Sequence, residues 1–392
     1  MDSKYLFLLQ LGIVLISAHL AGLLSERFKQ PAVLGQIIVG LILGAGFMEK
    51  TPMISEFAEI GVILLMFIAG LETDVKELVK SSRSSSLIAL GGVVLPAFFV
   101  YFGMRLILPD HDSNVALFLA VVSTATSVSI SVQTLREIAQ LRTRQGIMIL
   151  GAAIIDDIIG IILLTLLVGV VRPGAAGSIL MTVFKILAFF IVLYVVGKII
   201  VTVLRKLERT NISEDKLITW AIFICLVLSF TSEEFGVAAI TGAYFAGVIF
   251  SLTSHKHRVS HEVSKLSNFM FTPVFFVSIG MDIDLGAAFS ALGVGSLLIV
   301  LGVLGKVLGC GFGAYLTGFD RHHAIQIGIG MIPRAEVAII VANLGLQMSI
   351  LTDKEMAATI VMVLVTTLIT PSLLKWSFSR DAKPQEAHSH ST

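Results

Sequence analysis

The stretch GIMILGAAIIDDIIGIILLTLLVGVV, residues 146–171, carries two adjacent carboxylates, Asp156 and Asp157, in the middle of an otherwise uncharged apolar run. At about 1.5 Å per residue, a helix of this length exceeds the ~30 Å hydrocarbon core of a bilayer, so both acids fall near its midplane. An ionisable side chain at that depth costs roughly 2.5 to 3.5 kcal/mol on insertion scales. The run therefore predicts a membrane helix, and its paired acids indicate a functional site.

The composition extends this prediction to the whole chain of 392 residues. Hydrophobic residues make up 56% of it and charged residues 14%, whereas soluble domains contain about 25% charged residues. The net charge of +1 argues against a nucleic-acid partner, which would require clustered basic surface. Cys225 and Cys310 both lie inside apolar runs, so they indicate neither a disulfide framework nor a metal site.

Thirteen apolar segments, separated by short charged or turn-forming breaks, predict an all-α polytopic membrane protein with thirteen transmembrane helices. They cover residues 5–26, 31–48, 56–71, 86–108, 114–135, 146–171, 178–204, 217–232, 235–253, 267–281, 285–318, 323–348 and 355–376. The first is expected to be retained as a span, because its run is long and has no small-residue cleavage site. The stretch that contains His255, His257 and His261 is expected to be a solvated loop.

The lysines and arginines in alternate breaks predict the orientation. One set of breaks carries nineteen of these residues, whereas the other carries only Lys4, Lys50, Arg172 and Lys354. The richer set is expected to be cytoplasmic, with the N-terminus outside and the C-terminus in the cytoplasm. An odd number of spans agrees with this arrangement, and the expected location is the inner (plasma) membrane of the cell.

Short matches between distant segments indicate an inverted repeat. Gly35 and Gly40 of the second segment match Gly242 and Gly247 of the ninth, with the same spacing. The GLETD that ends the third segment also matches the GMDID at residues 280–284 that ends the tenth. The partners are seven spans apart, so one copy is inverted, as in many secondary transporters. Chance similarity between glycine-rich helices is the alternative.

The fifth and twelfth segments, which this repeat relates, both look interrupted at mid-depth. The fifth crowds hydroxyl side chains into residues 123–131, and the twelfth contains Pro333, Arg334 and Glu336. Proline removes a helical hydrogen bond, and hydroxyls can satisfy the carbonyls that are freed. The sequence predicts two crossed discontinuous helices that present half-helix ends to an ion. A kinked helix whose hydroxyls serve only packing is the alternative for the fifth segment.

Lys306 lies near the centre of the eleventh segment, where an isolated ammonium needs a partner. Its natural partner is one of the two aspartates. Because adjacent residues on a helix point about 100° apart, one carboxylate can pair with Lys306 while the other faces a cavity.

The motifs ILGAAIIDDIIG, LLMFIAGLE, GKVLG and GMIPRAEVAI together resemble the bacterial sodium/proton exchangers of the second monovalent cation:proton antiporter family, including its spore-germination branch. The resemblance covers nearly the whole chain and implies a homodimer surrounded by membrane lipid. It implies dimerisation (scaffold) helices in 1–84 and 211–284, ion-transporting core helices in 85–175 and 285–378, a linker helix in 176–210 and a cytoplasmic tail in 379–392.

The resemblance also implies roles for individual residues. Asp157 corresponds to the carboxylate that binds the metal cation Na⁺, and Asp156 to the partner of Lys306, which would carry a proton. Thr126 and Ser127 stand where the broken helix would offer oxygens to the cation. Pro333, Arg334 and Glu336 would support the other broken helix, where an ion pair between Arg334 and Glu336 and direct ion binding remain equal alternatives.

These inferences predict a secondary antiporter that exchanges Na⁺ for protons without a cofactor, with Li⁺ and K⁺ as alternative cations. Burial favours the neutral form of Asp157 and an arriving cation favours its ionised form, so the two ions compete for one site. The resemblance implies electrogenic exchange, because the paired acids and Lys306 show no departure from the family's pattern. A passive cation channel and a sodium/solute symporter of similar fold are the alternatives. An enzyme is not expected, since a catalytic aspartate dyad needs convergent carboxylates, and neighbours on a helix diverge.

Overall fold

The fold is all helical in the part of the chain that the structure, a computed structural model, describes: residues 6–108, 112–171, 179–207, 214–282 and 291–380. Its helices are α1 (Leu6–Arg27), α2 (Ala32–Gly44), α3 (Pro52–Glu72), α4 (Val75–Ile107), α5 (Ser113–Thr124), α6 (Val128–Glu137), α7 (Arg144–Val171), α8 (Ile179–Leu207), α9 (Glu214–Glu234), α10 (Ala239–Ser251), α11 (Lys256–Leu266), α12 (Thr272–Met281), α14 (Leu292–Leu316), α15 (Arg321–Gly330), α16 (Glu336–Gln347) and α17 (Asp353–Ser379). Arg172, Asp284 and the tail after Arg380 lie outside the described residues.

Within these ranges, nine stretches are helical, long and apolar enough to cross a membrane, and shorter apolar helices accompany them. The expected segments all contain helix, but some bounds differ. α4 begins at Val75, well before the expected residue 86, because a polar first section capped by Asp74 extends it. The domain boundary expected between residues 84 and 85 therefore falls inside a continuous helix.

The prediction of a solvated loop around His255, His257 and His261 is wrong in part. Residues 256–266 form the helix α11, which buries Val259 and Val263 and leaves its polar side chains outside. A π-helical turn at Ser267–Phe271 joins α11 to α12, and the Ser267 and Thr272 hydroxyls lie 2.8 Å apart across it. The polar composition concealed this helix, since only two buried side chains mark its inner face.

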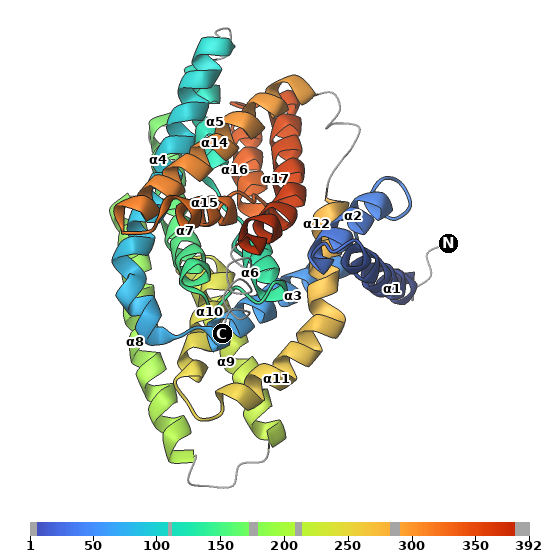
Figure 1. Cartoon of the computed structure of the whole chain (residues 1–392), viewed down its shortest axis with the longest axis vertical. Coiled ribbons are helices and arrows are strands. Elements are labelled where there is room, and N and C mark those ends of the chain that lie inside the picture. Colours follow the sequence, from blue (N-terminus) through green and yellow to red (C-terminus); the bar gives the residue numbers. More distant parts are fainter. Residues whose placement is uncertain (1–5, 109–111, 172–178, 208–213, 283–290, 381–392) are drawn as a thin grey trace, which may run out of the picture.

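Close backbone contacts join the helices of the expected repeats. A Cβ added to Gly70 on α3 would lie 2.0 Å from the Tyr244 carbonyl oxygen of α10, and one added to Gly247 on α10 would lie 2.0 Å from the Phe67 oxygen of α3. Only glycine permits an approach this close. α2 packs on α12 in the same way through Gly40 and Gly280. Figure 1 shows α2, α3 and α12 grouped together, with α1 at their outer edge.

The helices around the acid pair form a second group. α4 and α14 pack backbone to backbone, because a Cβ on Gly91 would lie 2.2 Å from the Gly309 oxygen and one on Gly309 would lie 2.1 Å from the Gly91 oxygen. α7 packs against α4, and α5, α16 and α17 lie close by (Figure 1). This group positions Lys306 of α14 opposite the acids of α7.

Candidate functional site

Two helix interruptions meet at the centre of the site. α5 ends at Thr124 and α6 begins at Val128, while α15 ends at Gly330 and α16 begins at Glu336. The Ser127 amide donates a hydrogen bond to the Pro333 carbonyl oxygen at 2.7 Å, and the Ser131 hydroxyl donates one to the Gly330 oxygen at 2.5 Å. Backbone groups that the interruptions free are thus satisfied by the opposite segment, which is the requirement for irregular backbone inside a membrane.

The guanidinium of Arg334 binds backbone carbonyl oxygens of three neighbouring segments. It is fully buried, and its Nη2 donates to the Ser123 oxygen of α5 at 2.8 Å and to the Gly302 oxygen of α14 at 3.0 Å. Its Nη1 donates to the Ile332 oxygen. The last carbonyls of a helix carry partial negative charge, so this cation stabilises the end of α5. The side chain of Glu336 lies outside the described residues, so the expected ion pair with Arg334 stays a prediction.

Lys306 and Asp156 form a buried ion pair. The Lys306 ammonium lies 3.0 Å from Asp156 Oδ1 and 3.1 Å from Oδ2, and the two side chains are 0% and 2% exposed. Asp156 also lies within electrostatic range of Arg334 and beside Thr126. A buried ammonium and a buried carboxylate that bind each other avoid the high cost of an unpaired charge.

Asp157, the neighbour of Asp156, faces a cavity of about 540 Å³. Thr126 and Ser127 of the α5–α6 interruption line the same cavity, as does Ser129 in the first turn of α6. The Thr126 hydroxyl is buried and lies beside the Asp156 carboxylate. The site therefore brings a carboxylate together with hydroxyl oxygens, the ligand type that Na⁺ and other hard cations prefer.

This cavity lies toward the end of the molecule where α3 begins and α9 ends. Glu59 of α3 and Glu233 of α9 line it, and no lysine or arginine does so among the described residues. A second cavity of about 560 Å³ shares Glu59 and Ala335 with it and lies between α3 and α12 on one side and α16 and α17 on the other. The acidic side chains that line the cavity at Asp157 favour cations over anions there.

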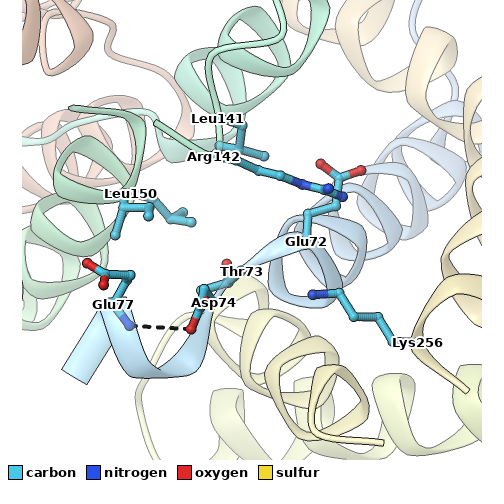
Figure 2. A pocket seen from close by; sticks show the side chains of 9 residues that line it. Glu72, Thr73, Asp74, Glu77, Leu141, Arg142, Leu150 and Lys256 are labelled. Atoms are coloured by element: carbon cyan, nitrogen blue, oxygen red, sulfur yellow. Dashed lines mark hydrogen bonds between the residues drawn. The ribbon is translucent and has the colours of Figure 1, made fainter. Parts of the chain in front are cut away.

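At the opposite end, a smaller pocket of about 300 Å³ lies among α3, α4, α7 and α11. Figure 2 shows Lys256 of α11 pointing into this pocket and the Arg142 side chain extending toward Glu72. Asp74 also lines it and accepts a hydrogen bond from the Glu77 amide (Figure 2). Neither Asp156 nor Asp157 contributes to its lining.

Sequence reasoning missed the part that backbone carbonyls play in this site. It considered Glu336 as the partner of Arg334, whereas the described partners of the guanidinium are three carbonyl oxygens. Carbonyl oxygens leave no mark in a sequence. The signal that could have found them is the interruption itself, since a helix that ends inside a membrane needs donors for its last carbonyls.

Known proteins resemble the chain over nearly its whole length. Residues 15–380 match the family model for the transmembrane part of sodium/hydrogen exchangers. The Na⁺/H⁺-K⁺ antiporter GerN of Bacillus cereus is 39% identical over 98% of this chain and 99% of its own, and a Na⁺/H⁺ antiporter of Enterococcus hirae is 32% identical over 93% and 96%. The sodium proton antiporter MjNhaP1 of Methanocaldococcus jannaschii is 16% identical and shares the fold, with a TM-score of 0.76 over 96% of this chain and 97% of that one. The chain therefore belongs to the family of transmembrane sodium/hydrogen exchangers.

Proposed function

We propose that this membrane transporter exchanges Na⁺ for protons and that both ions use the carboxylate of Asp157. The observation that carries the proposal is that the two acids have different surroundings: Asp156 forms an ion pair with Lys306, whereas Asp157 faces a cavity. A proton or a cation can then neutralise Asp157, and each excludes the other. The antiport activities named for relatives in Bacillus cereus and Enterococcus hirae support the same function.

Thr126 and Ser127 are proposed to supply oxygens to the cation, and Arg334 and Pro333 to hold the interruption that presents them. The buried hydroxyl of Thr126 supports the first role, and the hydrogen bonds from Arg334 to the end of α5 and to the middle of α14 support the second. Glu336 is proposed to contribute at the same interruption. The Lys306 ammonium is proposed to release a proton when its pair with Asp156 opens, which makes the exchange electrogenic.

An antiporter fits the cavities better than a channel does. The cavity at Asp157 and the pocket at the other end both touch α3, but residues 64–71 between them are all buried. A channel needs a continuous path, whereas alternating access needs a site that is open to one side at a time. A sodium/solute symporter would share this geometry, and the test below separates the two by proton movement.

The finer architecture is also proposed: thirteen spans, two inverted repeats and two discontinuous helices that cross near the midplane. The helix packing supports the repeats. α2 contacts α12 at Gly40 and Gly280, and α3 contacts α10 at the glycines that correspond to these in the proposed repeat, Gly247 and Gly70. The hydrogen bond between Ser127 and Pro333 supports the crossing. A homodimer in the plasma membrane, with scaffold and core domains and a cytoplasmic C-terminus, completes the proposal.

Proteoliposomes with an internal pH-sensitive dye test the function. Addition of Na⁺, Li⁺ or K⁺ is expected to move protons in the wild-type protein and to rank the ions. Asp157→Asn is expected to abolish this movement while the protein still inserts and folds. Glu56→Gln is the matched control, because Glu56 is an exposed acid of α3 that lines neither cavity beside the site. Cation leak without proton movement would favour a channel, and full activity of Asp157→Asn would contradict the proposed site.

A further inference from the structure

Two cavities follow the same helices from opposite ends. The cavity at Asp157 is lined by residues 59–63 of α3 and 157–164 of α7, whereas the smaller pocket is lined by residues 72–77 and 147–150. Between them, residues 64–71 of α3 are completely buried over about 12 Å of helix. Asp157 is thus accessible from the end where α3 begins and closed from the end where α3 finishes.

The contacts of Arg136 secure the closed end. Arg136 is the penultimate residue of α6, and its Nε lies 3.4 Å from Oε1 of Glu72, the last residue of α3. Its Nη2 donates to the Ser264 hydroxyl of α11 at 2.9 Å, and its Nη1 donates to Asn268 Oδ1 in the π-helical turn at 3.3 Å. Arg136 and Glu72 are 18% and 16% exposed, so water screens this pair less than a surface pair.

Glu137, the last residue of α6, binds a different helix. Its Oε2 accepts a hydrogen bond from the Ala32 amide at 2.6 Å, and its Oε1 accepts one from the Val33 amide at 3.3 Å. These amides belong to the first turn of α2, whose N-cap residue is Pro31 and makes no side-chain cap. The carboxylate therefore caps α2 from another helix and interacts favourably with its dipole.

Arg136 and Glu137 lie at the C-terminal end of α6, and the N-terminal end of this helix lies at the proposed ion site. α6 begins beside Ser127, at the interruption that lines the cavity of Asp157, and ends about 15 Å further on at Arg136 and Glu137. Its partners α2, α3 and α11 belong to the proposed scaffold, while α6 belongs to the proposed core. Movement of the core along the scaffold has to break these contacts first.

We infer that Arg136 and Glu137 form a latch that holds the core against the scaffold and closes the path from the smaller pocket to Asp157. The inference rests on the proposed transport function and adds to it the residues that keep one side shut. When the latch opens, α6 separates from Glu72, Ser264 and the start of α2, and the pocket of Figure 2 becomes continuous with the ion site. Residues of the latch set how often each side is open.

Thiol accessibility tests the latch without relying on ion chemistry. Ile147→Cys reports on the smaller pocket and Gly160→Cys on the cavity of Asp157, where an added Cβ has nothing within 4 Å. A membrane-impermeant thiol reagent is applied from each side, and the parent chain, whose Cys225 and Cys310 are buried, gives the blank. Arg136→Gln is expected to speed modification of Ile147→Cys at least about tenfold, the change that follows from losing even one of its charge-assisted contacts, and to slow modification of Gly160→Cys.

Arg83→Gln is the matched control, since it removes an exposed arginine of α4, and no hydrogen bond or ion pair joins this residue to α6 among the described residues. It is expected to leave both rates unchanged. If Arg136→Gln does not fold, Glu72→Gln removes the same ion pair from the other helix and should shift the rates in the same directions.

Faster modification of both cysteines would mean general loosening and would overturn the latch, as would unchanged rates in Arg136→Gln. The transport assay separates this failure from failure of the proposed function. Arg136→Gln retains cation-driven proton movement if Asp157 is the ion site, whereas Asp157→Asn loses it whatever the latch does.

Discussion

At the scale of single residues, each buried cation of the site binds oxygen atoms of neighbouring helices. Lys306 binds Asp156, Arg334 binds carbonyl oxygens at the end of α5 and in the middle of α14, and Asp157 faces the cavity. Removing one partner of a buried ion pair leaves an uncompensated charge, which costs about 3 to 5 kcal/mol. The stability of the protein and its transport chemistry therefore depend on the same few atoms.

This dependence predicts a specific pattern of rescue. Lys306→Gln is expected to lower the thermal unfolding midpoint in detergent, because Asp156 then stays buried without its ammonium. Adding Asp156→Asn to Lys306→Gln should restore much of the lost stability, since the remaining amides are neutral and can hydrogen-bond to each other. Asp157 should still exchange cations for protons in this double variant, but the exchange should no longer be electrogenic, because the proton that Lys306 supplies is missing. Two independent, additive losses would show instead that the pair contributes little coupling.

The residue scale also shows how far sequence reasoning reaches. The paired acids and Lys306 stand out because ionisable side chains in apolar runs are costly. Residue types and spacing alone left open which aspartate binds the lysine, because adjacent helix positions differ in direction but do not identify a neighbour. The family resemblance implied Asp156, and the structure has this pair. The choice of Asp156 depends on how α7 packs against α4 and α14, and this packing is set by contacts far apart in the sequence.

At the scale of helices, backbone contact through glycine determines which pairs can move. α3 and α10 meet at Gly70 and Gly247, and α2 and α12 meet at Gly40 and Gly280, each with a backbone atom where a side chain would stand. Close-packed backbones leave no side chains that could repack, so these pairs behave as rigid units. The boundary between α6 and its partners, held by polar side chains, is the softer one.

Gly70→Ala tests this rigidity. The new methyl group would overlap the Tyr244 carbonyl oxygen, so the variant is expected to lose roughly 1 to 3 kcal/mol or more of stability, measured as a lower unfolding midpoint. Gly12→Ala on α1 is the control, because its added Cβ would have nothing within 4 Å. It should leave the midpoint unchanged or raise it slightly, since alanine favours helix. Equal midpoints for both variants would contradict the close contact.

The same scale explains which helices the sequence predicts. Long apolar runs identify most of them, since periodic burial is strong there. α11 is missed because its inner face consists of Val259 and Val263, one turn apart among charged and histidine side chains. The polar beginning of α4 is missed for a related reason: Asp74 caps it and serines fill it, so hydropathy alone places the start too late.

At the scale of the whole molecule, the distribution of lysine and arginine predicts the orientation. Glu49→Cys in the break after α2 is expected to react with an impermeant thiol reagent on intact cells, and Arg321→Cys at the start of α15 only after the cells are permeabilised. Both positions are exposed in the structure, so access depends on the side of the membrane. Labelling of Arg321→Cys on intact cells would reverse the proposed orientation, and with it the side on which the latch lies.

The binding partners of Asp156 and of the end of α5 have a consequence for biosynthesis. Lys306, the partner of Asp156, is synthesised 150 residues later, and Arg334, the partner of the Ser123 carbonyl, is synthesised 211 residues later. When α5 and α7 have entered the bilayer, the Asp156 carboxylate and the carbonyl at the end of α5 therefore still lack Lys306 and Arg334, which have not yet been synthesised. The first half of this protein matures only when the second half is synthesised.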